Sequence, residues 1–258
     1  MEPVVPEEVA RFGRDIAAHL DARLGSDFIG AYFVGSIALG GYVPGQSDID
    51  IVAVTAHRLP DDLRRSLATE LLELSATCPG RGMELTLYSR RVAASPPAGA
   101  DFEVNVNGGP RMPPEIHLDA RQEPGFWYVI DRAIAHRSGV AIIGPPAADI
   151  FADAPPRKLL DAMLQSMRWH RQHEGATLYS VLNASRAWRY AVEGVLGSKL
   201  DAAVFARQRW SQPSIIDAAV DLRHGGAAHL DAPEVDRLLD HVESVLAEKW
   251  GGLRGLNP

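Results

Sequence analysis

The first half of the chain mixes helical and strand patterns of hydrophobic residues. Apolar side chains recur at helical spacing over residues 6–24 and again over 61–75, which predicts two amphipathic helices. Short runs rich in β-branched and aromatic residues predict buried strands over residues 28–35, 48–55 and 83–89. This alternation of helices and strands is typical of a domain in which helices pack on a sheet.

The segment that follows these strands carries weaker signals. Residues 90–99 are rich in proline and alanine and are predicted to form a surface loop. Residues 101–107 alternate polar and apolar side chains, as in a half-buried strand, and the Gly-Gly-Pro-Arg-Met-Pro-Pro sequence after them is predicted to end it. A helix is expected over residues 124–137, and the apolar residues 139–146 predict a short strand or a buried connection.

Strand patterns disappear beyond about residue 150. Helical patterns with short connections replace them, over residues 157–173, 178–195, 201–209, 213–223 and 232–250. Several helices joined by short loops favour an antiparallel bundle. We therefore expect an α+β domain with a mixed sheet and helices over residues 1–150, followed by an all-α helical bundle domain over residues 151–258.

Composition narrows the possible classes of function. The chain has 258 residues, of which 46% are hydrophobic and 23% charged, as in a folded globular protein. Its net charge of −7 disfavours binding to nucleic acid, because an acidic surface repels phosphate backbones, and suits a cationic ligand. The single cysteine, Cys78, excludes an intramolecular disulfide and a cysteine-based metal cluster.

Neither an export signal nor a membrane segment is predicted. The N-terminus lacks the basic start and apolar run of a secretory signal. Apolar stretches all fall short of the length of about 18 residues that a membrane helix needs. We expect a cytoplasmic protein that acts as a monomer or a weak dimer.

Two carboxylates stand two positions apart on the strand predicted over residues 48–55. Asp48 and Asp50 are therefore expected to point to the same face of a sheet. Unpaired carboxylates are costly to bury, and a divalent cation removes that cost. Magnesium is bound in proteins by one or two carboxylates together with substrate phosphates. The Asp-Ile-Asp sequence thus favours a site for magnesium and a phosphorylated substrate.

Polar residues of neighbouring segments fit such a site. Gly35 and Ser36 follow the first predicted strand, where a glycine lets the backbone approach a phosphate and a serine supplies a hydroxyl donor. Ser47, directly before the aspartate pair, adds a second hydroxyl. Glu84 lies in a strand of its own and would complete a carboxylate triad if that strand lies beside the aspartate strand.

The sequence GSIALGGYVPGQSDIDIVAV, residues 35–54, resembles the core motif of the DNA-polymerase-β-like nucleotidyltransferases. It resembles more closely that of the bacterial aminoglycoside adenylyltransferases, which modify streptomycin and spectinomycin. Further similarity lies in Glu-Leu-Thr at residues 84–86, IIGPPAAD at 142–149, Ser-Arg-Ala-Trp at 185–188 and Gly-Ser-Lys at 197–199. The resemblance covers most of the chain and places a nucleotidyltransferase domain before a helical domain.

This resemblance implies an enzyme that uses ATP and Mg²⁺ to transfer AMP to a hydroxyl of a small cationic molecule, an aminoglycoside or aminocyclitol antibiotic. Asp48 and Asp50 would bind magnesium. Glu84 would accept the proton of the acceptor hydroxyl or help to hold a second metal ion, and the sequence leaves both roles open.

The resemblance also implies contacts with the nucleotide phosphates. Gly35, Ser36 and Ser47 would supply them from the first domain. Arg186 and Lys199 would supply them from the helical domain, since guanidinium and ammonium groups stabilise transferring phosphates.

The chain departs from the family pattern in the residues that would bind the acceptor. Asn107 stands where the family has a tryptophan that stacks on the antibiotic. Glu174 is the only carboxylate close before the Ser-Arg helix, with Trp169 and His173 nearby as further candidates for acceptor contact. These departures leave open whether streptomycin or spectinomycin is the substrate.

Two other functions compete with this interpretation. One is a nucleotidyltransferase with a protein or an RNA as acceptor, although an RNA-acting enzyme would be expected to have a basic surface. The other is a non-catalytic, antitoxin-like regulator that binds a nucleotide without turnover. Loss of a carboxylate would indicate such a regulator, and Asp48, Asp50 and Glu84 are all present.

Overall fold

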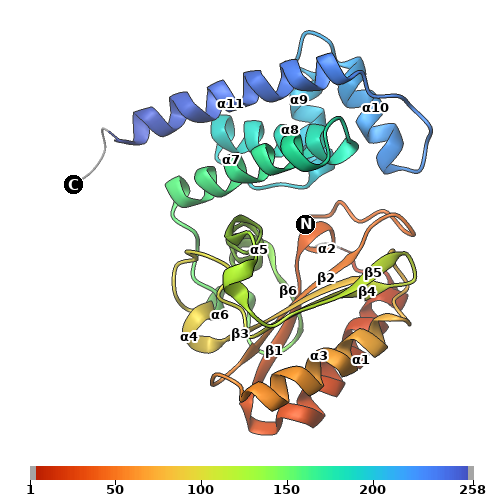
Figure 1. Cartoon of the computed structure of the whole chain (residues 1–258), viewed down its shortest axis with the longest axis vertical. Coiled ribbons are helices and arrows are strands. Elements are labelled where there is room, and N and C mark those ends of the chain that lie inside the picture. The colour runs from red at the N-terminus through yellow and green to blue at the C-terminus, as the bar shows by residue number, and fades with distance from the viewer. Residues whose placement is uncertain (1–3, 255–258) are drawn as a thin grey trace. The chain divides into compact units, whose positions relative to one another are not determined.

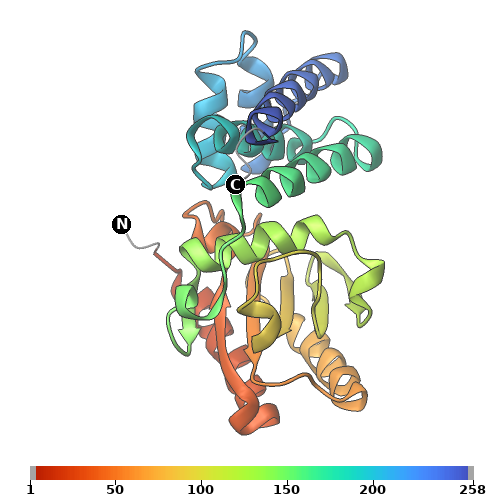
Figure 2. The ribbon, with the colours of Figure 1, turned by 90° about the vertical axis from the view of Figure 1, so that its left-hand side faces the viewer.

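The chain forms two compact units in the structure, a computed structural model that describes residues 4–254. One unit ends at Ala154 and the other starts at Pro155 (Figures 1 and 2). The sequence predicted the boundary between residues 150 and 151. The first helix of the second unit begins at Pro156, where the missing amide hydrogen of proline is tolerated because that position has no helical acceptor.

A six-stranded mixed sheet forms the centre of the first unit, in the order β5-β4-β3-β2-β1-β6. Strands β2 and β3 are parallel, and the other neighbouring pairs are antiparallel. The mixed sheet predicted from the sequence is therefore confirmed. The strands are β1 (Phe28–Phe33), β2 (Ile49–Thr55), β3 (Met83–Ser89), β4 (Val104–Gly109), β5 (Met112–His117) and β6 (Val140–Ile143).

Helices α1 (Glu7–Leu24) and α3 (Asp61–Ser75) cover one face of this sheet (Figure 1). Their apolar residues form one core with alternate residues of β2 and β3, among them Ile49, Ile51 and Met83. Both helices carry two acidic residues in the first turn. These carboxylates stabilise the helices because they lie at the positive end of the helix dipole. The two amphipathic helices predicted from residue spacing are thus confirmed.

Helix α5 (Gly125–Ser138) lies on the opposite face of the sheet (Figures 1 and 2). Its Arg132 is almost completely buried and lies over the ring of Tyr88 on β3, 5.5 Å from the ring centre. The same guanidinium donates hydrogen bonds to the carbonyl groups of Val92 and Ser95. A buried cation thereby holds the segment after β3 against the helix.

Two segments of the first unit differ from the sequence prediction. Strand β5 occupies residues that were predicted to break the sheet because of Pro113 and Pro114. These prolines are compatible with β5 because it is an edge strand, in which one side of the backbone needs no partner. A short helix, α4 (Arg90–Ala93), begins the segment predicted to be a loop.

Helices build the described part of the second unit, as predicted. Helix α8 is central, since it contacts each of the other four, and its Trp188 packs edge-on against Phe205 and His241. No helix within residues 4–254 combines the length and apolar character needed to span a membrane. The helices are α7 (Pro156–His173), α8 (Leu178–Glu193), α9 (Lys199–Arg207), α10 (Ser214–Arg223) and α11 (Ala232–Arg254).

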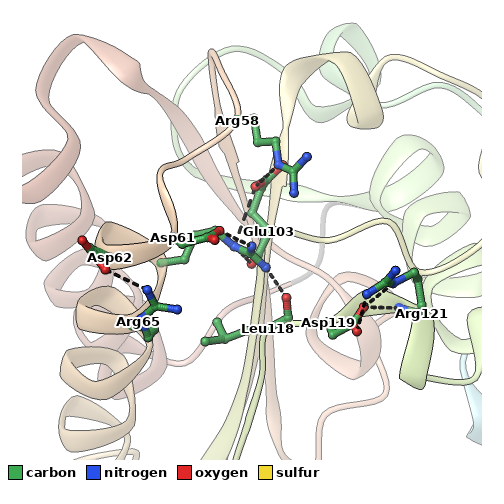
Figure 3. A network of polar contacts seen from close by, with 9 residues as sticks. Arg58, Asp61, Asp62, Arg65, Glu103, Leu118, Asp119 and Arg121 are labelled. Carbon is green, nitrogen blue, oxygen red and sulfur yellow. Dashed lines mark hydrogen bonds and ion pairs between the residues drawn. The ribbon is translucent and has the colours of Figure 1, made fainter.

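A buried arginine of α3 ties this helix to the sheet. Arg64 and the Glu103 carboxylate are both shielded from solvent, 3.9 Å apart. Arg64 also donates to the backbone carbonyl of Glu103 at 2.6 Å and to that of Leu118. Figure 3 shows Glu103, Leu118 and the neighbouring Arg58 together. Burial raises the pKa of Glu103, whereas Arg64 and Arg58 act in the opposite direction.

Replacement of this arginine tests its structural role. We expect Arg64→Met to lower the free energy of unfolding by about 3 kcal/mol, because it leaves two buried carbonyl groups without their donor and the buried Glu103 carboxylate without one of its two cations. Arg65→Met is the matched control, since Arg65 is exposed and pairs with Asp62 at the surface (Figure 3). It should change stability by less than about 0.5 kcal/mol. Urea denaturation measures both, and equal losses would contradict the assignment.

Candidate active site

Strand register places two of the predicted carboxylates side by side. In the parallel pair of β2 and β3, Asp50 lies opposite Glu84. Ile49 and Met83, one position earlier in each strand, are fully buried in the core formed with α1 and α3. Alternation along the strands therefore turns Asp50 and Glu84 to the other face. Asp50 is half-buried there, and Glu84 is exposed.

Asp48 lies one residue before β2, in a stretch whose backbone continues the strand pairing. Ile49 donates its amide hydrogen to the carbonyl of Gly82 at 2.8 Å. The backbone carbonyl of Ser47 accepts a hydrogen bond from the amide of Arg81 at 2.9 Å. This stretch therefore runs as an extended strand beside residues 81–82. The half-buried Asp48 is accordingly expected on the same side as the second aspartate, two positions later.

The Gly-Ser turn touches the aspartate pair. Gly35 opens the short helix α2 (Gly35–Ala38) with a left-handed backbone, φ 52°. A Cβ atom at Gly35 would lie 1.7 Å from Asp50 Oδ2, so only glycine fits without displacing the carboxylate. The backbone amide of Ser36 donates to this same oxygen at 3.4 Å. The Ser36 hydroxyl is buried, and no residue within 4–254 forms a hydrogen bond with it.

Two further predicted residues lie close to this turn and this pair of strands. Ser47 is fully buried, and its Oγ accepts a hydrogen bond from the amide of Val43 at 2.9 Å, which closes the turn before the aspartates. Asn107 of β4 lies opposite Glu84 in the antiparallel register. Its Oδ1 is buried and lacks a hydrogen-bond partner in the part of the chain that the structure describes. Asp50, Glu84 and Asn107 thus form a polar row across three strands.

The donor atoms of this site suit a metal ion that arrives with a phosphate. Among the described residues, no three His, Cys, Asp or Glu side chains are placed to hold a metal ion by themselves. Magnesium commonly takes one or two carboxylates and completes its shell with substrate phosphates and water. Asp48 and Asp50 can supply the carboxylates, and the Ser36 hydroxyl can donate to a phosphate oxygen.

Tyr128 of α5 is a neighbour of Glu84 that the sequence did not indicate. Burial raises the pKa of Tyr128, and the carboxylates of Glu123, Asp131 and Glu84 raise it further. Its ring packs against that of Phe102, with 5.1 Å between the ring centres. A tyrosine within an apolar helical pattern carries the same sequence signal as any core residue, and therefore only the packing of α5 reveals its position.

The cationic residues predicted in the second unit lie around one buried histidine. Arg186 of α8 donates to Asn183 Oδ1 at 3.3 Å. Lys199 begins α9 and places its ammonium group 5.1 Å from the centre of the Tyr179 ring. Burial lowers the pKa of His170, and the charges of Lys199 and Arg186 act in the same direction. The structure thus brings Arg186 and Lys199 near a common neighbour.

Local sequence signals set the positions of these two cations. Gly194 ends α8 in a left-handed conformation with φ 71°, which glycine adopts without strain. Ser198 then caps α9, because its Oγ accepts a hydrogen bond from the amide of Asp201 at 3.0 Å. Lys199 is therefore the first residue of α9.

Three of the four residues predicted to contact the acceptor lie at the end of α7, whereas Asn107 lies on β4. Trp169 stacks on His173, with 4.7 Å between ring centres and 19° between ring planes. Glu174 Oε2 lies 2.8 Å from His170 Nδ1 and accepts a hydrogen bond from Thr177 at 3.2 Å. The predicted site residues therefore fall into two groups, one in each unit. The polar row, Asp48 and the Gly-Ser turn belong to the first unit, and the cations and the α7 residues to the second.

Known proteins match the chain along most of its length. Residues 149–247 match the family model of the aminoglycoside adenylyltransferase C-terminal domain. An aminoglycoside (3'')(9) adenylyltransferase of Rhizobium radiobacter is 27% identical over 266 residues, which covers 96% of this chain and 95% of the relative. A spectinomycin 9-adenylyltransferase of Staphylococcus aureus is 28% identical over 191 residues, 70% of this chain and 72% of the relative.

The fold also has a counterpart among solved structures. The crystal structure of spectinomycin adenyltransferase AAD(9) from Enterococcus faecialis with ATP and spectinomycin matches 94% of this chain and 100% of its own, with a TM-score of 0.71 and 17% sequence identity. Similar folds, relatives that align along both units and a matching C-terminal domain agree with one another. Residues 149–247 therefore match the C-terminal domain of aminoglycoside adenylyltransferases, and the chain is similar to these enzymes along both units.

Proposed function

We propose that the protein transfers AMP from ATP to a hydroxyl group of an aminoglycoside or aminocyclitol. The observation that carries this proposal is the pairing of Asp50 with Glu84 on adjacent strands, with the turn at Gly35 and Ser36 against Asp50. One end of the sheet thereby offers carboxylates for a metal–phosphate complex and, next to them, a carboxylate that can take a proton.

The reaction exchanges one bond at phosphorus for another. The acceptor oxygen forms a bond to the α-phosphorus of ATP, and the bond from this phosphorus to the oxygen that bridges to the β-phosphate breaks. Pyrophosphate leaves with the bridging oxygen. Glu84 accepts the proton of the acceptor hydroxyl, a role that suits an exposed carboxylate beside the aspartates. Asp48 and Asp50 would hold Mg²⁺, which when bound offsets the negative charge of the phosphates.

Each unit offers groups that can bind a phosphate. In the first unit, the buried Ser36 hydroxyl lies beside Asp50 and donates to a phosphate oxygen. Ser47 closes the turn that presents the aspartates, so its contribution is to their placement. In the second unit, Arg186 and Lys199 carry positive charges of the kind that stabilise phosphates.

The residues proposed for contact with the acceptor differ from the family pattern. Asn107 extends the polar row beyond Glu84 and can hydrogen-bond to an acceptor hydroxyl or amine. Trp169 and His173 offer stacked rings, and Glu174 offers a carboxylate. A cationic acceptor also suits the net charge of −7. Because ATP is the co-substrate, we place the reaction in the cytoplasm.

Transfer of a labelled nucleotide tests this function. The purified chain is incubated with ATP labelled at the α-phosphate, Mg²⁺ and a panel that contains streptomycin, spectinomycin and other aminoglycosides. We expect label in at least one antibiotic, release of pyrophosphate, and loss of transfer with EDTA that added Mg²⁺ restores. Label in RNA or in protein would favour another acceptor, and nucleotide binding without transfer would favour a regulator.

Removal of charge at the paired carboxylates should stop the reaction. We expect Asp50→Asn and Glu84→Gln each to lower kcat for transfer by about 10³-fold, because one loses a metal ligand and the other the proton acceptor. Glu73→Gln, an exposed glutamate of α3, is the matched control and should retain wild-type activity. Thermal unfolding of each variant verifies the fold. A site variant that keeps more than about a tenth of the activity would refute its assignment.

The contact between Gly35 and Asp50 can be tested with a second glycine of similar backbone. Both Gly35 (φ 52°) and Gly40 (φ 69°) are left-handed, so alanine strains both by about 1–2 kcal/mol. Only at Gly35 would the new Cβ displace the Asp50 carboxylate, since nothing lies within 4 Å at Gly40. We expect Gly35→Ala to lower transfer by about 100-fold and Gly40→Ala by less than about threefold. Equal activities would show that this contact does not matter.

A further inference from the structure

A chain of polar contacts runs through the second unit from Glu174 to Arg186. Glu174 Oε2 lies 2.8 Å from Nδ1 of His170. The other ring nitrogen of His170, Nε2, lies 2.8 Å from Asn183 Nδ2. Asn183 Oδ1 then accepts a hydrogen bond from the Arg186 guanidinium at 3.3 Å. Helices α7 and α8 thus share a continuous polar connection that ends on a cation predicted to bind phosphate.

The chemistry of these groups fixes the direction of every hydrogen bond. A guanidinium only donates, so the oxygen of Asn183 must face Arg186 and its NH₂ group must face His170. His170 Nε2 is therefore an acceptor, and the single ring proton is on Nδ1. This proton is donated to Glu174, which as a carboxylate only accepts. A neutral His170 in the Nδ1–H form is the state that satisfies the whole chain.

The surroundings of His170 favour this neutral form. His170 and Asn183 are 5% and 6% exposed. Burial lowers the pKa of His170, the Glu174 carboxylate opposes that change, and the nearby Lys199 and Arg186 charges lower the pKa further. Helix α11 also packs on α7, and its Asp236 and Asp240 pair with Arg171.

Protonation of His170 would require the side-chain amide of Asn183 to flip. The imidazolium would carry hydrogens on both nitrogens, so Nε2 could no longer accept from Asn183. Asn183 would then turn its oxygen toward His170 and its NH₂ group toward Arg186. Two donors would face each other, and the guanidinium would have to leave its position.

We infer that His170 and Asn183 are positioning residues that hold the Arg186 guanidinium in the orientation in which it binds the phosphates of ATP. This inference rests on the proposed function of Arg186. Glu174 takes part as the hydrogen-bond acceptor that keeps the ring proton on Nδ1.

Substitutions of Asn183 distinguish the hydrogen bonds that its side chain forms from its contribution to packing. Asn183→Leu preserves size but removes both hydrogen bonds, and we expect kcat/KM for ATP to fall by about tenfold, with the acceptor KM at saturating ATP unchanged. Asn183→Asp retains an acceptor for Arg186 and should lose less than Asn183→Leu. Ser185→Ala is the matched control, because Ser185 is fully buried on the same helix and donates only to the Val181 carbonyl at 2.8 Å. Equal losses in the three variants would overturn the inference.

A double-mutant cycle tests whether the effect passes through Arg186. Asn183→Leu should cost kcat/KM for ATP nothing further once Arg186→Ala is present, because the group that it positions is gone. Independent losses that multiply would overturn the positioning role. Thermal unfolding of the full chain verifies that each variant is folded.

A pH profile tests His170 separately. In His170→Gln the side chain still offers one donor and one acceptor but cannot become charged. Because burial lowers the pKa of His170, the wild-type kcat/KM for ATP should be full at neutral pH and fall only at a pH below the ordinary range of a histidine, whereas that of His170→Gln should fall less. Protonation of ATP affects both proteins equally and cancels in the comparison. Superimposable profiles would contradict a role for the neutral ring.

A spectroscopic measurement tests the relay without reference to activity. Long-range proton–nitrogen spectra of the full chain should show His170 as the Nδ1–H tautomer, with a mixture of tautomers in Asn183→Leu. A dominant Nε2–H form in the wild type would overturn the inference, whether or not the protein transfers AMP. Absence of transfer by the wild type, with the expected tautomer present, would instead refute the proposed function.

Discussion

The parallel pairing of β2 with β3 is the constraint on which the proposed active site depends. It sets Asp50 opposite Glu84, and the alternation of the strands turns both away from the core that contains Ile51 and Leu85. A slip of one residue in β3 would bury Glu84 under the helices and expose its apolar neighbours. The hydrophobic core therefore holds the register, and the carboxylates meet as a consequence of that register.

Buried arginines in the first unit and Arg186 in the second have different hydrogen-bond partners. Arg64 and Arg132 in the first unit are almost inaccessible, and they donate to backbone carbonyl groups that would otherwise be buried without partners. Arg186 in the second unit is only half-buried, and it donates a hydrogen bond to the side chain of Asn183. Backbone carbonyls hold a cation in place with the fold itself, whereas a side-chain amide can turn when its neighbour changes charge. The two environments suit a structural and a phosphate-binding role, respectively.

Compared with the family pattern, the candidate site retains the residues needed for phosphate chemistry. It differs in the residues proposed to contact the acceptor. The aspartates and the Gly-Ser turn depend on β1, β2 and the connection between them. Asn107 lies on the other side of Glu84, on β4. A substitution there changes the surface beside the proposed base without disturbing the metal ligands. Separation of the two surfaces on different strands lets one fold keep a reaction while its acceptor changes.

The sequence by itself determined the types of element and the reaction class. The helix over residues 61–75 and the strand over residues 83–89 have the predicted bounds, because local periodicity and flanking turn residues decide them. Strand β5 was not predictable, since its prolines are acceptable only at a sheet edge and an edge is defined by the other strands. The place of Tyr128 near Glu84 and the link from His170 through Asn183 to Arg186 were equally hidden. Only the tertiary structure decided them, because register and helix packing join residues that no local pattern relates.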